Sequence, residues 1–211
     1  MGSRERRTRE RAETRQRILD AARKLFVRKG VEATTMRAIA NEIEYTPTAI
    51  YHHFASKHEL LLELCNIDFR ALAAAFLRIG RVDDPIERLS RIGEAYVDFA
   101  LEHPMQYQLL FMTRHPDVSR AREHVRGDPT EDAYAFLRDT CADVIATGRL
   151  RGEFGDPEEV AQMAWASLHG LIALHIIKED DPWIEWRDVR RTAARMGESL
   201  IRGMHRMPGV E

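Results

Sequence analysis

The chain has few of the features that fix a protein's class at once. Its 211 residues include two cysteines, Cys65 and Cys141, and neither has a Cys or His partner at metal-ligand spacing. Both lie in apolar helical patterns, which favours buried, reduced thiols over a redox pair. No uninterrupted apolar run approaches the roughly 18 residues of a membrane span, and the Arg-rich start lacks the apolar core of a secretory signal. We therefore expect a cytoplasmic protein with no metal, no cofactor and no membrane partner.

Catalytic motifs are missing as well. The chain has no Gly-x-Ser-x-Gly elbow, no His-Glu-x-x-His pair and no Gly-rich phosphate loop. His169 and His175 are six residues apart, which is the wrong spacing for two metal ligands on one helix face. Strand-like alternation flanked by hairpin turns does not occur in the sequence either. These absences favour an all-α protein that is not an enzyme.

Charge is distributed unevenly along the chain. The net charge is -2, but residues 1–57 hold 13 Lys and Arg against 7 Asp and Glu, a net of +6, and the remainder holds 19 against 27, a net of -8. A basic end suits a polyanion, because neutralising phosphates releases condensed counterions. The alternative is a solvated surface that is charged without binding anything. The segment from Arg4 to Arg17 is the most Arg-rich, and we expect it to be mobile until it binds.

Apolar spacing predicts three helices in this basic part. The first shows the spacing of one buried face and stops at Gly30, with apolar residues at Ile18, Ala21, Ala22, Leu25 and Phe26. Thr34 or Thr35 can cap a short second helix, whose inner face carries Met36, Ile39, Ala40 and Ile43. Thr46-Pro47 begins a third helix of two turns that ends near Phe54, because Pro suits the first helical position.

Two short helices joined by a tight turn, after a basic helix, form the core of a helix-turn-helix. In the third helix Ile50 and Phe54 are expected to anchor inward. This leaves groups suited to phosphates or base edges facing outward, on Thr46, Thr48, Tyr51 and His52. Spacing alone leaves Tyr51 equally able to face inward. His53 points about 100° away from His52 on a helix and is assigned to local packing or capping.

The rest of the chain also reads as helical. Ser56-Lys57-His58-Glu59 has capping-box spacing and opens a long amphipathic helix that reaches Gly80. Five further helices are expected, over Pro85 to Glu102, Met105 to Met112, Glu131 to Thr147, Pro157 to Lys178 and Ile184 to Met204. A long loop is expected from Thr113 to Pro129. We predict a DNA-binding domain with an N-terminal arm over residues 1–57, and a connecting helix plus a C-terminal domain over residues 58–211.

The sequence resembles the tetracycline-repressor (TetR) family of bacterial regulators. The resemblance runs in ordered register through Ile18-Leu19-Asp20-Ala21-Ala22, Leu25-Phe26, Lys29-Gly30, Thr34-Thr35-Met36-Arg37-Ala38-Ile39-Ala40, Ala49-Ile50-Tyr51-His52-His53-Phe54 and Ser56-Lys57-His58-Glu59-Leu60-Leu61. It implies an all-helical dimer in which a three-helix DNA-binding domain is joined by a long helix to a ligand-binding and dimerisation domain. The resemblance departs at Glu44, where the family commonly has Gly in the turn. Either the turn avoids a positive φ, or Glu44 bears a modest strain.

The resemblance also implies the DNA contacts. The family's phosphate-contacting positions correspond to Tyr51, Lys57 and the helix start at Thr35, and Arg37 lies beside the last of these. Groove-facing positions match Thr46, Pro47, Thr48 and His52. Lys57 begins a capped helix, where a positive charge opposes the helix dipole, so an external anion would compensate it. The arm adds Arg4, Arg6 and Arg7.

The second half resembles a TetR subgroup whose C-terminal domain bears a Trp-x-x-x-His-Gly signature, here Trp165 to Gly170. Trp165 and His169 are spaced i, i+4 and so share a helix face. They can line an effector pocket, or they can pack in the core with His169 satisfied by a neighbour. The candidate effector residues are Tyr96, Phe99, Tyr107, Phe111, Trp165 and His169.

The last two helices carry stripes that suit a dimer. One stripe has small residues among larger ones, at Ala164, Ser167, Gly170, Leu171 and Leu174, and the other has Val189, Ala193, Met196, Leu200 and Ile201. A monomer core could absorb both stripes, but two operator half-sites about 34 Å apart favour a dimer. The predicted function is a homodimeric transcriptional regulator, a repressor released from operator DNA by a small, largely apolar effector. The alternatives are a carrier or enzyme, and an architectural DNA binder without sequence preference.

Overall fold

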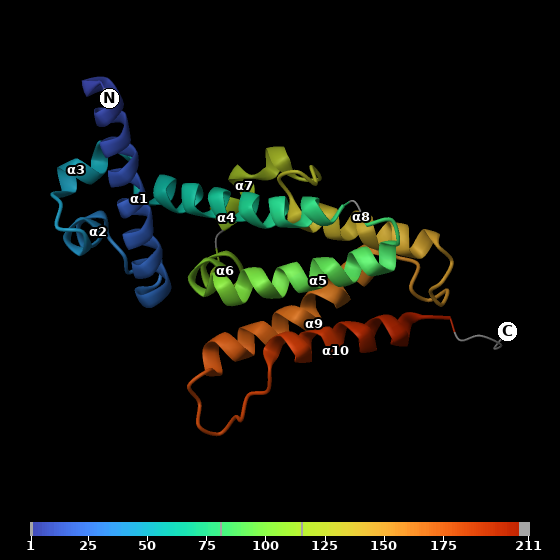
Figure 1. Cartoon of the computed structure of the whole chain (residues 1–211). Coiled ribbons are helices and arrows are strands. Elements are labelled where there is room, and N and C mark those ends of the chain that lie inside the picture. The colour runs from blue at the N-terminus through green and yellow to red at the C-terminus, as the bar shows by residue number, and fades with distance from the viewer. Residues whose placement is uncertain (1, 81, 115, 207–211) are drawn as a thin grey trace. The chain divides into compact units, whose positions relative to one another are not determined.

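The computed structural model describes residues 2–80, 82–114 and 116–206 (Figure 1). The described residues form α-helices joined by short connections, with one 3-10 helix and one isolated bridge between Leu150 and His205. The all-α prediction is therefore confirmed. By packing, the chain divides into two compact units, Met1–Asp68 with Met105–Glu123, and Phe69–Pro104 with His124–Glu211. The functional boundary expected at residue 57 stays a prediction.

The first unit holds the basic helices. Its elements are α1 (Ser3–Lys29), α2 (Met36–Glu42), α3 (Pro47–Tyr51), the start of α4 (Lys57–Ile79), α6 (Pro104–Phe111) and α7 (Pro116–Ala121). Their apolar faces meet in a core that includes Phe26, Ile39, Ile50, Phe54 and Leu64. The predicted inward faces of the first three helices are thus buried, with Ile43 half-buried at the end of α2. A buried ion pair between Arg23 and Asp68 joins α1 to α4.

The second unit is built on the remainder of α4 with α5 (Pro85–Glu102), α8 (Ala133–Ala146), α9 (Pro157–Lys178) and α10 (Val189–Met204). Four of these helices begin at an aspartate whose side chain accepts a backbone N–H of the first turn, at Asp84, Asp132, Asp156 and Asp188. The bounds predicted for α5 and α9 agree with the structure. α10 begins five residues later than predicted, at Val189 rather than Ile184, because the Asp188 cap fixes its start.

The two cysteines are free and buried, one in each unit. Burial raises the pKa of the Cys65 thiol to about 12, and it does the same for Cys141. Both therefore stay protonated at neutral pH, as expected of buried thiols that fill space in a core.

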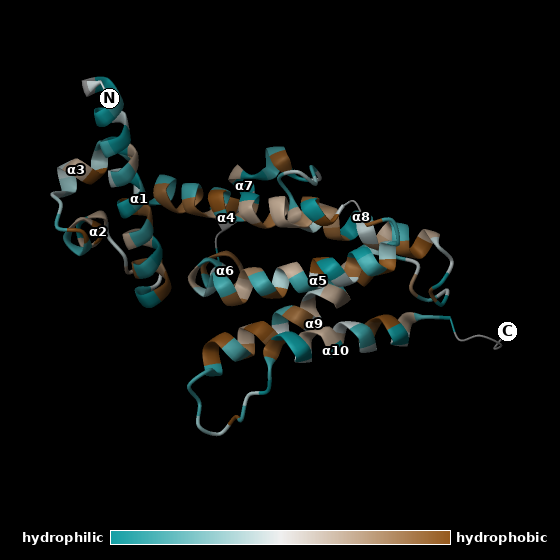
Figure 2. Cartoon of the chain, in the orientation of Figure 1, coloured by the Kyte–Doolittle hydropathy of each residue, from teal (hydrophilic) through white to brown (hydrophobic). Residues whose placement is uncertain are grey.

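α9 is the most apolar of the long helices. It contains an 18-residue window with hydropathy 1.5, long and apolar enough by length and composition to cross a membrane, although we expected no such stretch from the lack of an uninterrupted apolar run. Only 17% of that window is buried, so α9 leaves much of its apolar surface uncovered within the single chain. Figure 2 shows its hydrophobic residues gathering toward the end that leads into the loop before α10.

Candidate nucleic-acid interface

The Arg-rich segment expected to be mobile is the first half of α1. It is helical from Ser3 onward, so that expectation was wrong. Oppositely charged side chains four residues apart support the helix: Arg9 pairs with Glu13 at 2.7 Å, and Arg6 lies 3.5 Å from Glu10. The predicted arm residues Arg4, Arg6 and Arg7 are all exposed on this helix.

The start of α2 settles which threonine caps it. Thr35 is the N-cap, since its hydroxyl accepts the N–H of Ala38 at 3.1 Å. Thr34 is buried instead, and its hydroxyl donates to the carbonyl of Gly30 at 2.8 Å. Gly30 closes α1 with a φ of 83°, as predicted for a glycine stop. The second helix thereby begins with Thr35 and Arg37 exposed.

The turn between α2 and α3 is a Schellman motif. The N–H of Tyr45 donates to the carbonyl of Ala40 at 2.9 Å, and the N–H of Glu44 donates to the carbonyl of Asn41 at 3.3 Å. This pattern needs a left-handed residue, and Glu44 supplies it with a φ of 59°. Of the two alternatives left open by the sequence, the strained one is therefore correct. Arg17 braces the turn by donating to the carbonyl of Ile43 at 3.4 Å.

α3 is a short helix with one buried and one free face. The Thr46 hydroxyl accepts the N–H of Ala49 at 3.3 Å, and Pro47 occupies the first turn. Ile50 is fully buried, whereas 53% of Tyr51 is exposed, so Tyr51 faces outward. Thr46, Thr48 and His52 are exposed and Pro47 is half-buried. The helix ends at Tyr51, a turn earlier than predicted, and Phe54 packs beneath it under the Arg15 guanidinium.

Lys57 lies at the start of α4 and has local partners. Its ammonium donates to the carbonyl of Val31 at 2.7 Å and to that of Glu32 at 3.2 Å. These carbonyls compensate its charge, so the external anion invoked from the sequence is not needed for that purpose. The capping box also differs slightly from the expected one, because the Glu59 carboxylate accepts the N–H of Ala55 at 2.6 Å rather than that of the cap residue Ser56. Lys57 thus fixes the loop after α1, and a remaining N–H can still reach a phosphate.

Arg11 is a basic residue at this surface that sequence reasoning missed. Burial lowers the pKa of His53, and the nearby charges of Arg11 and Arg15 lower it further. Arg11 is exposed and therefore extends the basic surface of α1 toward the end of α3. Its spacing from Arg4 and Arg7, at i, i+3 and i+7, was the signal available in the sequence.

Three of the predicted effector residues form one hydrogen-bonded cluster in the second unit. The Tyr96 hydroxyl accepts the indole N–H of Trp165 at 2.9 Å and lies 3.1 Å from Nδ1 of His169. Tyr96 is buried, and the other two side chains are half-buried. Burial lowers the pKa of His169, which favours the neutral imidazole. The polar groups of the cluster thus hydrogen-bond to one another, as a structural role requires. Trp165 and His169 nevertheless keep part of their surface exposed.

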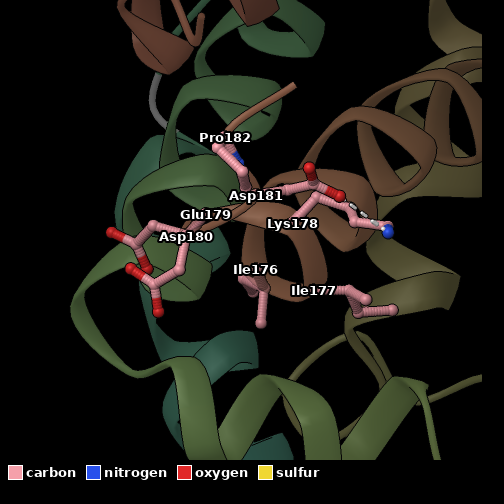
Figure 3. A pocket seen from close by; sticks show the side chains of 7 residues that line it. All are labelled: Ile176, Ile177, Lys178, Glu179, Asp180, Asp181 and Pro182. Carbon is pink, nitrogen blue, oxygen red and sulfur yellow. Dashed lines mark hydrogen bonds and ion pairs between the residues drawn. The ribbon is translucent and has the colours of Figure 1, made fainter. Parts of the chain in front are cut away.

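The remaining candidate effector residues have other neighbours. Phe99 packs against His103 with the rings tilted by 60° and their centroids 5.5 Å apart. Tyr107 and Phe111 belong to the first unit, where their rings pack at a tilt of 53° with centroids 5.2 Å apart. A hollow of about 420 Å³ lies elsewhere, at the end of α9, and is lined by Ile176 through Pro182 (Figure 3). None of the six candidate residues lines this hollow, which is therefore distinct from the predicted effector site.

Comparisons with known proteins agree with this arrangement. Residues 18–64 match the family model for bacterial regulatory proteins of the tetR family, and residues 89–203 match the model for a tetracyclin repressor-like C-terminal domain. The HTH-type transcriptional repressor KstR2 of Mycobacterium tuberculosis is 30% identical over 138 residues, which cover 65% of this chain and 67% of KstR2. The regulator UidR of Escherichia coli is 38% identical over 90 residues, covering 42% of this chain and 40% of UidR.

Solved structures share the fold along almost the whole chain. The TetR family regulator PfmR from Thermus thermophilus superposes with a TM-score of 0.70 at 26% identity, covering 90% of this chain and 99% of PfmR. The structure of KstR2 gives a TM-score of 0.66 at 21% identity, covering 92% of this chain and 96% of that one. Similarity thus extends through both compact units, beyond the helix-turn-helix alone.

Proposed function

The chain belongs to the TetR family of bacterial regulatory proteins, and from this membership we propose that it is a homodimeric repressor which a small, largely apolar effector releases from a palindromic operator. Membership of this family implies DNA binding and transcription regulation, because its members are regulators rather than enzymes. KstR2, which is named as a repressor, supports repression as the mode of regulation. The same role assigns the chain to the cytoplasm, where operator DNA is accessible.

The outward face of α3 carries this proposal. Burial of Ile50 and exposure of Tyr51 turn a capped, rigid helix so that polar groups face solvent. Such a helix fits a major groove, where hydroxyl, imidazole and methyl groups can read base edges. We assign groove contacts to Thr46, Pro47, Thr48 and His52. Backbone contacts are assigned to Thr35, Arg37, Tyr51, Lys57 and the α1 arginines Arg4, Arg6, Arg7 and Arg11.

The homodimer is supported by the uncovered apolar surface of α9. Leu174 and Ile177 are 59% and 64% exposed, although both are large apolar side chains in a regular helix. A surface of this kind is typical of an interface. We propose that α9 and α10 of two copies form an isologous four-helix bundle. The two α3 helices would then occupy half-sites separated by about 34 Å or a multiple of it.

The effector is assigned to the surroundings of the cluster formed by Tyr96, Trp165 and His169. We keep the interpretation that the Trp-x-x-x-His-Gly signature marks this subgroup of the family. Two half-buried aromatic rings and one hydrogen-bonding hydroxyl suit an apolar molecule with a single polar group. Binding would release the operator if the effector preferred a dimer whose two α3 helices no longer match successive grooves.

Operator binding by the Tyr51→Ala variant tests the proposal. The probe is a duplex selected from a random pool by the wild-type protein and measured by fluorescence anisotropy across a salt series. We expect Tyr51→Ala to weaken binding by about 5- to 150-fold at every salt concentration and to leave the salt slope nearly unchanged, because a neutral hydrogen bond to the backbone is lost and no cation is removed. Leu77→Ala, at an exposed apolar residue of α4, is the matched control and should bind as the wild type does.

Three outcomes of this experiment separate the alternatives. Unchanged affinity in Tyr51→Ala would remove the assignment of α3 as the recognition helix. Equal displacement of the probe by excess random duplex would favour an architectural binder without sequence preference. Release of the bound probe by added apolar compounds is the corresponding test of the effector.

A further inference from the structure

The connection from the last residue of α9 to the cap of α10, residues Lys178 to Asp188 and called the loop below, presents an uncovered tryptophan. Trp183 is 93% exposed in the single chain, more than any other large hydrophobic residue among those described. Trp186, three residues further on, behaves differently, since its ring packs edge-on against His175 with centroids 5.0 Å apart. The loop thus turns one tryptophan inward and the other outward.

The backbone under Trp183 is held in place. The Asp181 carboxylate accepts the Trp183 N–H at 3.1 Å and the Lys178 ammonium at 2.9 Å. The indole N–H of Trp186 donates to the carbonyl of Lys178 at 2.9 Å, which ties the far side of the loop to the end of α9. Because these hydrogen bonds already fix the loop, burying Trp183 against a partner costs the loop little conformational entropy.

Charge indicates which partner fits. The loop carries five acidic residues against two basic ones, a net of -3, whereas α10 carries four arginines against Glu198, a net of +3. An acidic loop is repelled by DNA and by anionic lipid, so neither suits as the surface that covers it. A second copy of the chain offers both an apolar α9 and a basic α10. Ion pairs within the chain already use Asp181, Glu185 and Arg190. The charges left to complement one another between two copies are Glu179 and Asp180 of the loop and Arg191 and Arg195 of α10.

The indole is large enough to contribute a substantial share of the buried interface area. A stable interface buries about 800 Å² on each partner, and a tryptophan supplies roughly 150–250 Å². Trp183 lies five residues after the last residue of α9, at the end of the helix where Leu174 and Ile177 are uncovered. A two-fold interface uses the same residue on both sides, so one substitution removes two such contacts.

We propose that Trp183 anchors the interface with a second copy of the chain and is buried against the partner's α9–α10 pair. This inference rests on the proposed homodimer and adds to it a loop residue outside the two helices assigned to the bundle. It predicts that Trp183 is protected from solvent in the assembled protein and becomes accessible when the dimer dissociates.

Sedimentation equilibrium of the full chain provides the test. We expect Trp183→Ala to raise the dimer dissociation constant at least about 30-fold, as for a tryptophan at the centre of an interface. Tyr51→Ala is the matched control, because it removes an exposed aromatic residue from the DNA-binding surface and should leave dimerisation unchanged. Quenching by acrylamide, which is neutral and so is not repelled by the acidic loop, is compared between the wild type and Trp183→Phe. It reports the accessibility of Trp183 itself and needs no destabilised variant.

The outcomes distinguish this inference from the homodimer. A wild-type dimer in which Trp183 is freely quenched, with Trp183→Ala dimerising normally, would overturn the anchor and leave the homodimer standing. A wild type that is monomeric at all concentrations would overturn both. A Trp183 emission shift caused by phosphatidylcholine vesicles but not by self-association would replace the second copy with a lipid surface. Should Trp183→Ala lose its helical circular dichroism, protection of Trp183 in the wild type decides the question.

Discussion

Glu44 places a backbone strain at the centre of the helix-turn-helix. A non-glycine residue in the left-handed region is disfavoured by the contact between its Cβ and the following carbonyl. Glu44 is exposed, and its φ of 59° is required by the Schellman motif that ends α2. The strain is tolerated because two backbone hydrogen bonds and the Arg17 brace fix the turn.

Replacing this residue should therefore stabilise the protein. We expect Glu44→Gly to raise the free energy of unfolding by about 0.5–1 kcal/mol, since the relief of strain exceeds the extra entropy of glycine in the unfolded chain. Urea unfolding of the full chain measures it. Glu44→Ala is the control, because it removes the carboxylate but keeps the Cβ, and a gain of the same size there would locate the effect in charge rather than in strain.

Residue-level prediction worked where a local rule determines the answer. Gly30 as a helix stop, Thr46 as a cap and the inward positions of Ile50 and Phe54 follow from spacing and capping chemistry. The partners of Lys57 could not be predicted from spacing, because they are the carbonyls of Val31 and Glu32, which lie 26 and 25 residues away in sequence. The orientation of Tyr51 also needed the structure, since helical spacing alone permits either face.

At the scale of elements, α1 combines paired and unpaired arginines on different faces. Arg9 is neutralised by Glu13, while Arg11, two residues further, points roughly 200° away around the helix. Arg11 lies close enough to His53 to lower the pKa of that imidazole. The face that carries Arg11 is therefore the one that reaches toward the end of α3.

The two faces should differ in DNA binding. We expect Arg11→Ala to reduce the slope of log affinity against log salt by about 1, because one phosphate contact is lost. Arg9→Ala should change the slope much less, since its charge is already satisfied by Glu13. Anisotropy titrations from low to moderate salt measure both variants, and equal losses would indicate a diffuse basic field rather than a specific face.

Element boundaries were predictable where a cap and an apolar period coincide. Asp84-Pro85 and Asp156-Pro157 mark the starts of α5 and α9 at the sequence level. The expected loop from Thr113 to Pro129 instead contains α7 and a 3-10 turn (Glu123–Val125), because short helices leave little periodicity to detect. For the Arg-rich segment the sequence predicted too little structure. Its charge suggested mobility, whereas its i, i+4 pairs support a helix.

At the scale of the whole molecule, stability depends on two half-buried histidines as well as on packing. His169 is hydrogen-bonded to Tyr96 in the second unit, and His53 lies beside two arginines in the first. Burial lowers the pKa of both side chains in the folded protein below the ordinary value of 6.5. The unfolded chain therefore binds more protons than the folded chain as the pH falls through this range, and the folded state loses stability.

The contribution of His169 can be isolated by substitution. The full stabilisation is present above about pH 6.5 and decreases as the pH falls toward the lowered pKa of the folded state. We expect His169→Gln to flatten the decrease of the unfolding free energy between pH 7.5 and 5.5, because the amide can still pair with Tyr96 but does not titrate. Urea titrations at both values measure it, with His52→Gln as a control at an exposed imidazole. Parallel decreases in the wild type and in His169→Gln would place the acid sensitivity at His53 or elsewhere, and would show that the Tyr96 cluster does not sense pH.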